Sequence, residues 1–192
     1  MRQTASNLTA VCRRLTAERG LAGFTIEEVC DQVDVSRRTF FNYFSCKEDA
    51  VIGADAEDEF HLFSESFLAG RPGEWAAVLR DLVALAIAHF EAEGMDAASH
   101  TDFMVALERE PRLMARFIGL SRDRERQLRA LIAEREGVSQ DDVHVVVIVS
   151  LLATLMQSSA QRFLEPANTQ DFSTILTAAL AAFRTVLAVP TP

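Results

Sequence analysis

Apolar residues recur every three or four positions along most of the chain, which is the spacing of helices with one buried face. Near the N-terminus, for example, Leu8, Val11, Cys12 and Leu15 fall on one face. Strand-like alternation with a period of two is not a feature of the sequence. The pattern therefore predicts an all-α fold of nine helices, over residues 4–19, 26–33, 37–44, 46–68, 78–94, 99–109, 111–136, 140–163 and 172–187.

Polar residues mark where the short N-terminal helices begin. Thr25 and Glu28 form a capping box, in which the threonine hydroxyl accepts a bond from a backbone N–H and the glutamate reaches back. Ser45 and Glu48 are predicted to form a second box, and Ser36 is placed to cap the helix between them. Two short helices joined by a three-residue turn, with a third packed across them, are typical of a helix-turn-helix.

Composition agrees with this fold. Eight glycines and five prolines in 192 residues favour long helices over a sheet with many turns. We predict a head, residues 1–50, and a larger helical ligand-binding and dimerisation body, residues 51–192. The most apolar stretch, Val145–Met156, is too short to span a membrane and is interpreted as a buried helix.

Three cysteines, an odd number without metal-ligand spacing, indicate reduced thiols in a cytoplasmic protein with no membrane partner. The opening residues are mixed and amphipathic, which is not the pattern of a secretory leader. The four histidines also lack the close spacing of a metal site, so no metal or other cofactor is predicted.

The net charge of −9 at first argues against a nucleic-acid partner. Residues 1–50, however, carry seven basic and seven acidic side chains, so the remaining 12 basic and 21 acidic side chains place the whole of the −9 in the body. The thirteen residues from Val35 to Lys47 include three basic side chains and no acid. A local cationic surface matters more for DNA than the total, because salt screens charges beyond about 10 Å.

The stretch TIEEVCDQVDVSRRTFFNYFSCKEDAV, residues 25–51, resembles the DNA-binding head of the TetR family. It shows Val-Ser at the turn, Thr-aromatic-aromatic-x-Tyr-Phe after it, and Lys-Glu two residues later. Asp34 departs from the glycine usual in the family, but aspartate tolerates a left-handed backbone better than most residues. Val33 replaces the usual alanine, which implies slightly wider packing between the second and third helices.

Spacing and resemblance together select candidate DNA contacts. Val29, Val35, Phe40 and Phe44 are spaced to hold the third helix in the head's core. Arg37 or Arg38 could read a guanine, and Phe41 or Thr39 a thymine methyl, whereas the resemblance implies phosphate contacts for Tyr43, Thr25 and Lys47, the only lysine. Solvated surface arginines and a core position for Phe41 are the alternatives. The predicted DNA-binding residues are Thr25, Ser36, Arg37, Arg38, Thr39, Phe41, Asn42, Tyr43 and Lys47.

The last two predicted helices resemble the family's dimerisation pair, and their wide apolar faces favour a homodimeric four-helix bundle over a monomer core. Apolar residues interleaved with histidines suggest a small-molecule cavity in the body, although ordinary core packing explains each residue too. Residues 108–142 resemble, more loosely, the C-terminal domain of TetR members that bind acyl-CoA-like ligands. The predicted ligand-binding residues are Phe63, Phe67, His89, Phe90, Phe103, Met104, Leu107 and Phe117.

The resulting expectation is a ligand-released repressor that binds a palindromic double-stranded DNA operator as a dimer, and that is not an enzyme. A ligand that prefers a different separation of the heads would lower DNA affinity by its differential binding to the two states. Activation of transcription or a ligand-free regulator remains open. So does an all-helical carrier or enzyme without DNA binding, although no nucleophile–base pair or phosphate-cradling loop supports catalysis. A helical protein-interaction adaptor would need neither Lys47 nor the acid-free third helix.

Overall fold

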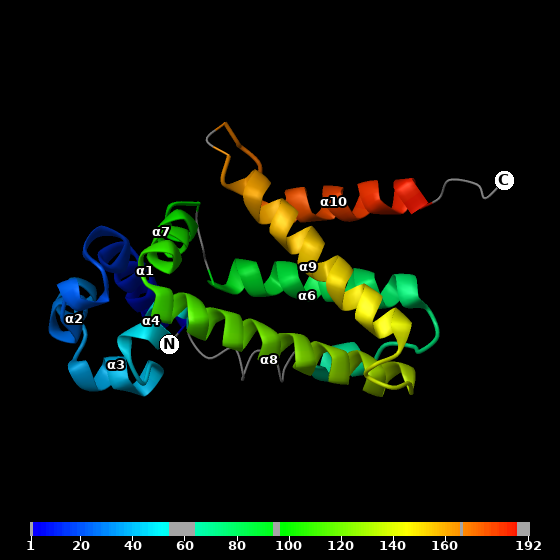
Figure 1. The fold of residues 1–192 in the computed structure, drawn as a ribbon, viewed down its shortest axis with the longest axis horizontal. Helices are drawn as coiled ribbons and strands as arrows, with labels where there is room; N and C mark the ends of the chain where they lie inside the picture. The colour runs from blue at the N-terminus through cyan, green and yellow to red at the C-terminus, as the bar shows by residue number, and fades with distance from the viewer. Residues whose placement is uncertain (1, 54–63, 94–96, 166, 188–192) are drawn as a thin grey trace. The chain divides into compact units, whose positions relative to one another are not determined.

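The computed structural model describes residues 2–53, 64–93, 97–165 and 167–187 (Figure 1). Every regular element within these residues is a helix, so the predicted all-α fold class is confirmed. The elements in chain order are α1 (Arg2–Arg19), the 3-10 turn η1 (Leu21–Gly23), α2 (Ile26–Val33), α3 (Arg37–Tyr43), α4 (Lys47–Ile52), α6 (Trp75–Glu93), α7 (Ala97–Arg109), α8 (Pro111–Glu136), α9 (Val143–Phe163) and α10 (Phe172–Leu187).

The chain forms two compact units. The first unit comprises residues 1–60 and 93–123, and the second comprises residues 61–92 and 124–192. The first unit therefore contains the head together with α7 and the first half of α8. The second half of α8 belongs with α6, α9 and α10.

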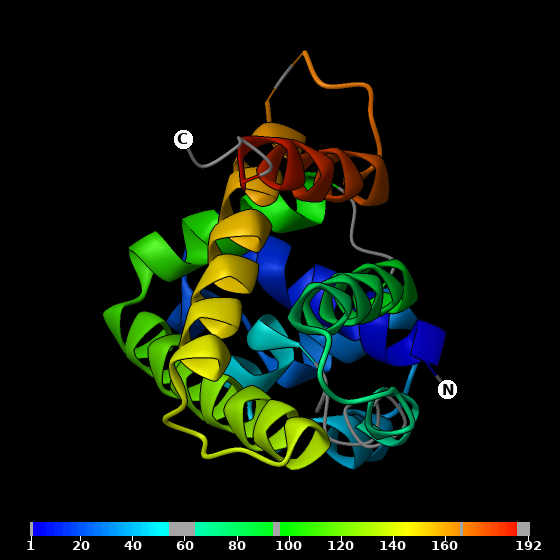
Figure 2. The ribbon, with the colours of Figure 1, turned by 90° about the vertical axis from the view of Figure 1, so that its right-hand side faces the viewer.

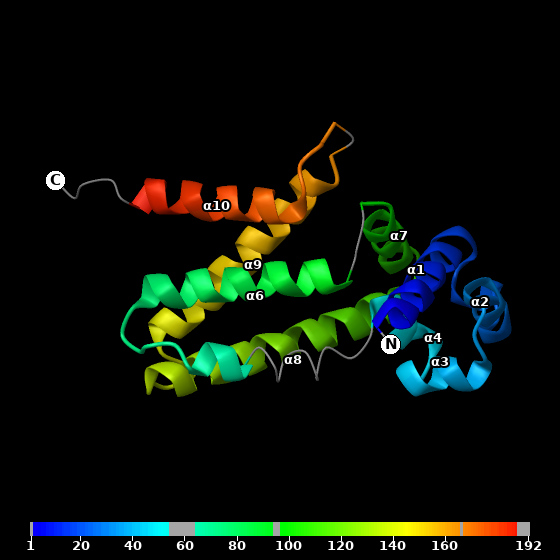
Figure 3. The ribbon, with the colours of Figure 1, turned by 180° about the vertical axis from the view of Figure 1, so that it is seen from behind.

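In the first unit α1 lies between α2 and α7 (Figure 3) and also packs against α4. The apolar stripe of α1 is fully buried at Leu8, Cys12 and Leu15, as its helical spacing requires. Phe103 and Leu107 of α7 enter the same core. The core of the head is thus completed by residues that lie more than 50 positions beyond its end.

Polar contacts also fasten α7 and α8 to the end of α1. The Arg109 guanidinium donates to the carbonyls of Ala17 and Glu18, at 3.2 and 3.1 Å. Glu110 accepts a 2.8 Å bond from the backbone N–H of Leu21. Gly20, with φ of 75°, makes this approach possible, because a Cβ there would stand 2.8 Å from the Glu110 carboxylate.

In the second unit α10 returns from the end of α9 and packs against it (Figure 2). The Phe90 ring of α6 stacks on Phe172 of α10, with ring centroids 4.1 Å apart, and Phe163 of α9 meets Phe90 edge-on at 5.6 Å. Offset and edge-on aromatic contacts of this kind add to the free energy gained from burial. The three rings join α6, α9 and α10.

A buried arginine fixes the end of α8 in the second unit. Arg135 donates to Asp81 at 2.8 Å, and its guanidinium lies 4.5 Å from the centre of the Phe67 ring. The Arg135 side chain is only 2% exposed. Gly70 makes room for it, because a Cβ at that position would stand 2.5 Å from the guanidinium carbon.

Several sequence predictions need correction. The fourth helix was expected to reach residue 68, but α4 ends at Ile52, where Gly53 has φ of 126° and leaves the helical region. The capping box expected at Ser45 and Glu48 does not form: the N-cap is Cys46, whose side chain makes no cap bond. The turn η1 was not foreseen, and the segment 54–63, placed in the expected fourth helix, lies outside the described residues.

α9 extends beyond the apolar stretch recognised in the sequence. Its 21 residues are long and apolar enough to cross a membrane by length and composition, although a core helix of a soluble protein passes the same test. The buried positions Val145, Ile148, Val149, Leu152 and Leu155 follow helical spacing along one side. This one-sided burial fits a helix that packs with α10.

Candidate nucleic-acid interface

The turn between α2 and α3 has the geometry that the sequence predicts. Asp34 adopts the left-handed conformation, with φ of 57° and ψ of 50°, and its backbone N–H bonds to the carbonyl of Cys30. The Thr25 hydroxyl accepts a 3.1 Å bond from the Glu28 N–H, and the Ser36 hydroxyl accepts a 3.0 Å bond from the Thr39 N–H. Both helices of the motif therefore begin at the predicted caps.

The third helix, α3, buries one face and exposes another. Phe40 and Phe44 are 0% and 3% exposed in the head's core. Phe41, for which a core position was the alternative, is 45% exposed instead. Of the candidates for DNA contact on α3 and its cap, Ser36, Arg37, Arg38, Phe41 and Asn42 are exposed, whereas Thr39 and Tyr43 are half-buried.

The two neighbouring arginines of α3 differ in their surroundings. Arg37 donates through Nη1 to Oε1 of Glu27 at 2.5 Å, and its guanidinium carbon lies 5.5 Å from the centre of the Phe41 ring. Arg38 is exposed and forms no ion pair within the part of the chain that the structure describes. One arginine thus has partners within the head, and the other points into solvent.

Lys47 has structural partners that sequence reasoning missed. Its ammonium donates to the backbone carbonyls of Leu21 and, at 2.9 Å, Phe24, and it lies 4.6 Å from the centre of the Phe24 ring. These contacts join η1 to the start of α4. An ammonium has three donors, so two carbonyl bonds leave one for a phosphate, and the phosphate contact stays a prediction.

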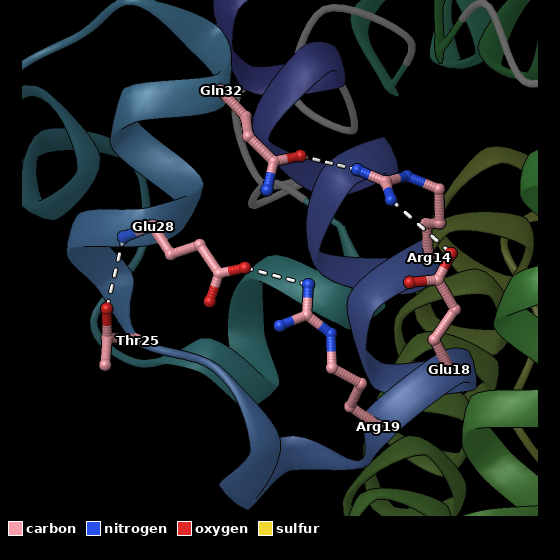
Figure 4. Close-up of polar contacts among 6 residues, drawn as sticks. All are labelled: Arg14, Glu18, Arg19, Thr25, Glu28 and Gln32. Atoms are coloured by element: carbon pink, nitrogen blue, oxygen red, sulfur yellow. Dashed lines mark hydrogen bonds and ion pairs between the residues drawn. The ribbon is translucent and has the colours of Figure 1, made fainter.

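Polar side chains of α1 brace α2 from the side (Figure 4). Arg19 pairs with Glu28 at 2.8 Å, and Arg14 donates to Gln32 at 2.5 Å while pairing with Glu18 at 3.4 Å. The carboxylate of Glu28 therefore pairs with a side chain of α1. These contacts join α1 to α2, and because they are exposed, each contributes little to stability.

Two further arginines hold α4 within the first unit. Arg13 of α1, only 4% exposed, donates to the carbonyls of Val51 and Ile52, each at 2.9 Å. Arg116 of α8 pairs with Asp49, and this hydrogen bond raises the pKa of the Arg116 guanidinium above its ordinary value. The sequence gives no local signal for either contact, because each partner lies 38 or more positions away.

The predicted ligand-binding residues fall in both units. Phe67, His89 and Phe90 lie in the second unit. Phe103, Leu107 and Phe117 lie in or against the head's core in the first unit, and Met104 there is 40% exposed. Phe63 lies outside the described residues. A single pocket lined by the whole set stays a prediction.

Comparison with known proteins bears on the head first. Residues 8–51 match the family described as bacterial regulatory proteins, tetR family. The HTH-type transcriptional regulator TcmR of Streptomyces glaucescens is 33% identical over 150 residues, which is 74% of this chain and 64% of TcmR. The chain thus spans less than two thirds of that relative's length, but the similarity extends well beyond the head. The matched helix-turn-helix and this longer similarity show that the chain belongs to the TetR family of bacterial regulatory proteins.

Proposed function

We propose that this protein is a sequence-specific DNA-binding regulator of transcription that binds a palindromic operator as a homodimer. The observation that carries the proposal is the exposed face of α3. Phe40 and Phe44 anchor the helix, and Arg37, Arg38 and Asn42 remain available on its surface. Arginine and asparagine form the bidentate hydrogen bonds that distinguish guanine and adenine in the major groove.

The apolar residues left exposed on α9 and α10 support the homodimer. Val143 and Val147 of α9 are 66% and 48% exposed, and Val186 of α10 is 70% exposed. The same helices in a second copy would cover these side chains in a four-helix bundle. A dimer would present two copies of α3, which can enter successive major grooves about 34 Å apart.

The proposed regulation is repression of transcription that ends when a small molecule binds and the protein releases DNA. Support comes from the second unit, where Phe90 and Phe163 are only partly buried around the stacked Phe172. An apolar molecule with an acyl chain, such as an acyl-CoA, is the proposed effector class. Calorimetry with acyl-CoAs of increasing chain length tests it, and no heat of binding at any length would remove this class.

The test of DNA binding is selection from a pool of random duplexes. It is run in parallel with the wild type and with an Arg37→Ala/Arg38→Ala variant. The wild type is expected to enrich a palindrome that the variant fails to enrich. Binding of the selected duplex should weaken by about 0.9 log units per tenfold increase in salt for each phosphate contact.

Failure of the folded wild type to enrich any sequence at low salt would overturn the proposal. It would favour a carrier or enzyme without DNA binding. The dimer is tested separately by light scattering of the wild type and of Val147→Arg. The wild type should be a dimer, and the variant should shift toward monomer, because a charge at that exposed position of α9 would be buried in the interface.

A further inference from the structure

We propose that Glu27 is a positioning residue that presents Arg37 to a DNA base, so that Arg37 reads sequence and Arg38 binds the phosphate backbone. The inference rests on the proposed DNA binding and adds a division of labour within α3. It assigns a role in DNA recognition to an acidic residue, although acidic side chains are normally repelled by DNA.

The argument starts from the placement of the two partners. Glu27 is in the first turn of α2, and Arg37 is the first residue of α3, directly after the Ser36 cap. Their 2.5 Å contact therefore links the two helices of the motif across the turn at Asp34. The bond from the Asp34 N–H to the Cys30 carbonyl holds the turn between the two helices.

The contact leaves the reading edge of Arg37 available. Glu27 accepts from Nη1, whereas Nε and Nη2 form the other edge of the planar guanidinium. Two parallel donors on one edge match O6 and N7 of guanine. The Phe41 ring, 5.5 Å from the guanidinium carbon, limits the side chain from a second direction. An arginine restrained in this way loses less conformational freedom when it meets a base.

Arg38 lacks this restraint among the described residues and is exposed. A mobile cation suits a phosphate, which accepts hydrogen bonds from many directions and carries no sequence information. The two arginines should therefore fail differently when removed. Loss of Arg37 should relax preference at one base position in each half-site, and loss of Arg38 should weaken all duplexes similarly and lower the salt dependence.

The pair is exposed, which allows a clean test. The side chains of Arg37 and Glu27 are 62% and 55% exposed, and exposed pairs contribute little to stability. Glu27→Gln should therefore fold as the wild type does. Glu28→Gln is the matched control, because it removes the same charge from the neighbouring position, where the carboxylate pairs with Arg19 of α1 (Figure 4).

The experiment uses the full-length protein and the duplex selected by the wild type. Affinities for that duplex, for its single-base variants and for a scrambled duplex are measured for wild type, Glu27→Gln, Glu28→Gln, Arg37→Ala and the Glu27→Gln/Arg37→Ala double variant. Glu27→Gln should lower the ratio of the affinity for the selected duplex to that for the scrambled duplex, on the order of threefold to tenfold. The single-base variants should show that preference is lost at the same base position in Glu27→Gln and in Arg37→Ala. In the Arg37→Ala background, Glu27→Gln should have no further effect on that ratio.

Other outcomes overturn the inference. Equal strengthening of binding to all duplexes by both glutamine variants would show that Glu27 only repels phosphates. An unchanged ratio in Glu27→Gln, with a palindrome still selected by the wild type, would remove the positioning role and leave the proposed function intact. Absence of any selected sequence would overturn both.

Discussion

Arg13 offers the sharpest test of how the head is held together. Its guanidinium is buried, donates to the last carbonyls of α4 at Val51 and Ile52, and lies 4.7 Å from the centre of the Phe103 ring of α7. One side chain thus joins α1, α4 and α7. Arg13→Met keeps most of the aliphatic volume and removes every polar contact.

The expected cost follows from these contacts. Two hydrogen bonds from a charged donor contribute about 1.5–3 kcal/mol each, and the contact with the aromatic ring adds about 1–2 kcal/mol. The wild type also spends several kcal/mol on removing the guanidinium from water, which methionine does not require. We expect a net loss of about 3 kcal/mol in the free energy of unfolding, and a fall of more than about 10 °C in the midpoint of the first unit.

Arg14→Met is the matched control. Arg14 is the next residue of α1, but its ion pair with Glu18 and its bond to Gln32 are both exposed, so their loss should cost about 0.5 kcal/mol or less. Far-UV circular dichroism follows both units, whereas fluorescence of the only tryptophan, Trp75 in the second unit, follows that unit. Arg13→Met should lower the dichroism midpoint more than the fluorescence midpoint. Equal stabilities of the two variants would refute the role given to Arg13.

Two further predictions concern glycines and thiols. Gly70→Ala should destabilise the second unit by about 1–3 kcal/mol in urea unfolding, because the new Cβ would meet the buried Arg135 guanidinium. At Gly119 of α8 a Cβ would meet open space among the described residues, so Gly119→Ala should instead stabilise the protein by about 1 kcal/mol. A lower free energy of unfolding in that variant would contradict the exposed position of Gly119. In thiol labelling at pH 8, half-buried Cys46 should react well before Cys12, because burial raises the pKa of the Cys12 thiol to about 12; equal rates would contradict its burial.

Local features of the head and of α8 are predictable from sequence. The expected ranges 26–33 and 111–136 coincide with α2 and α8. Within α8 an i,i+4 ion pair joins Glu125 and Arg129, at 2.5 Å. Caps, turn residues and helical spacing act over a few positions, so the sequence displays them directly. The left-handed Asp34 belongs to the same class, since its conformation follows from the turn it occupies.

The features that the sequence does not predict depend on partners far away in the chain, and one depends on a single glycine. Arg13 and Arg14 look alike in the sequence, and only packing against α4 and α7 distinguishes the buried one. Phe103 follows the same apolar pattern whether it lines a cavity or fills the head's core, so its role could not be assigned from periodicity. Gly53 did carry a usable signal, because glycine commonly ends helices, and it marks the end of α4.

The solitary lysine has a practical consequence for following the head in the intact protein. A lysine-specific protease has one target in this sequence, the peptide bond after Lys47. In the fold that side chain is bonded to the carbonyls of Leu21 and Phe24, and the bond to be cut lies at the first turn of α4. Cleavage therefore requires local opening, and the rate of a single cut reports how often the head opens. Bound DNA should slow that cut, which provides an assay of occupancy that needs no label.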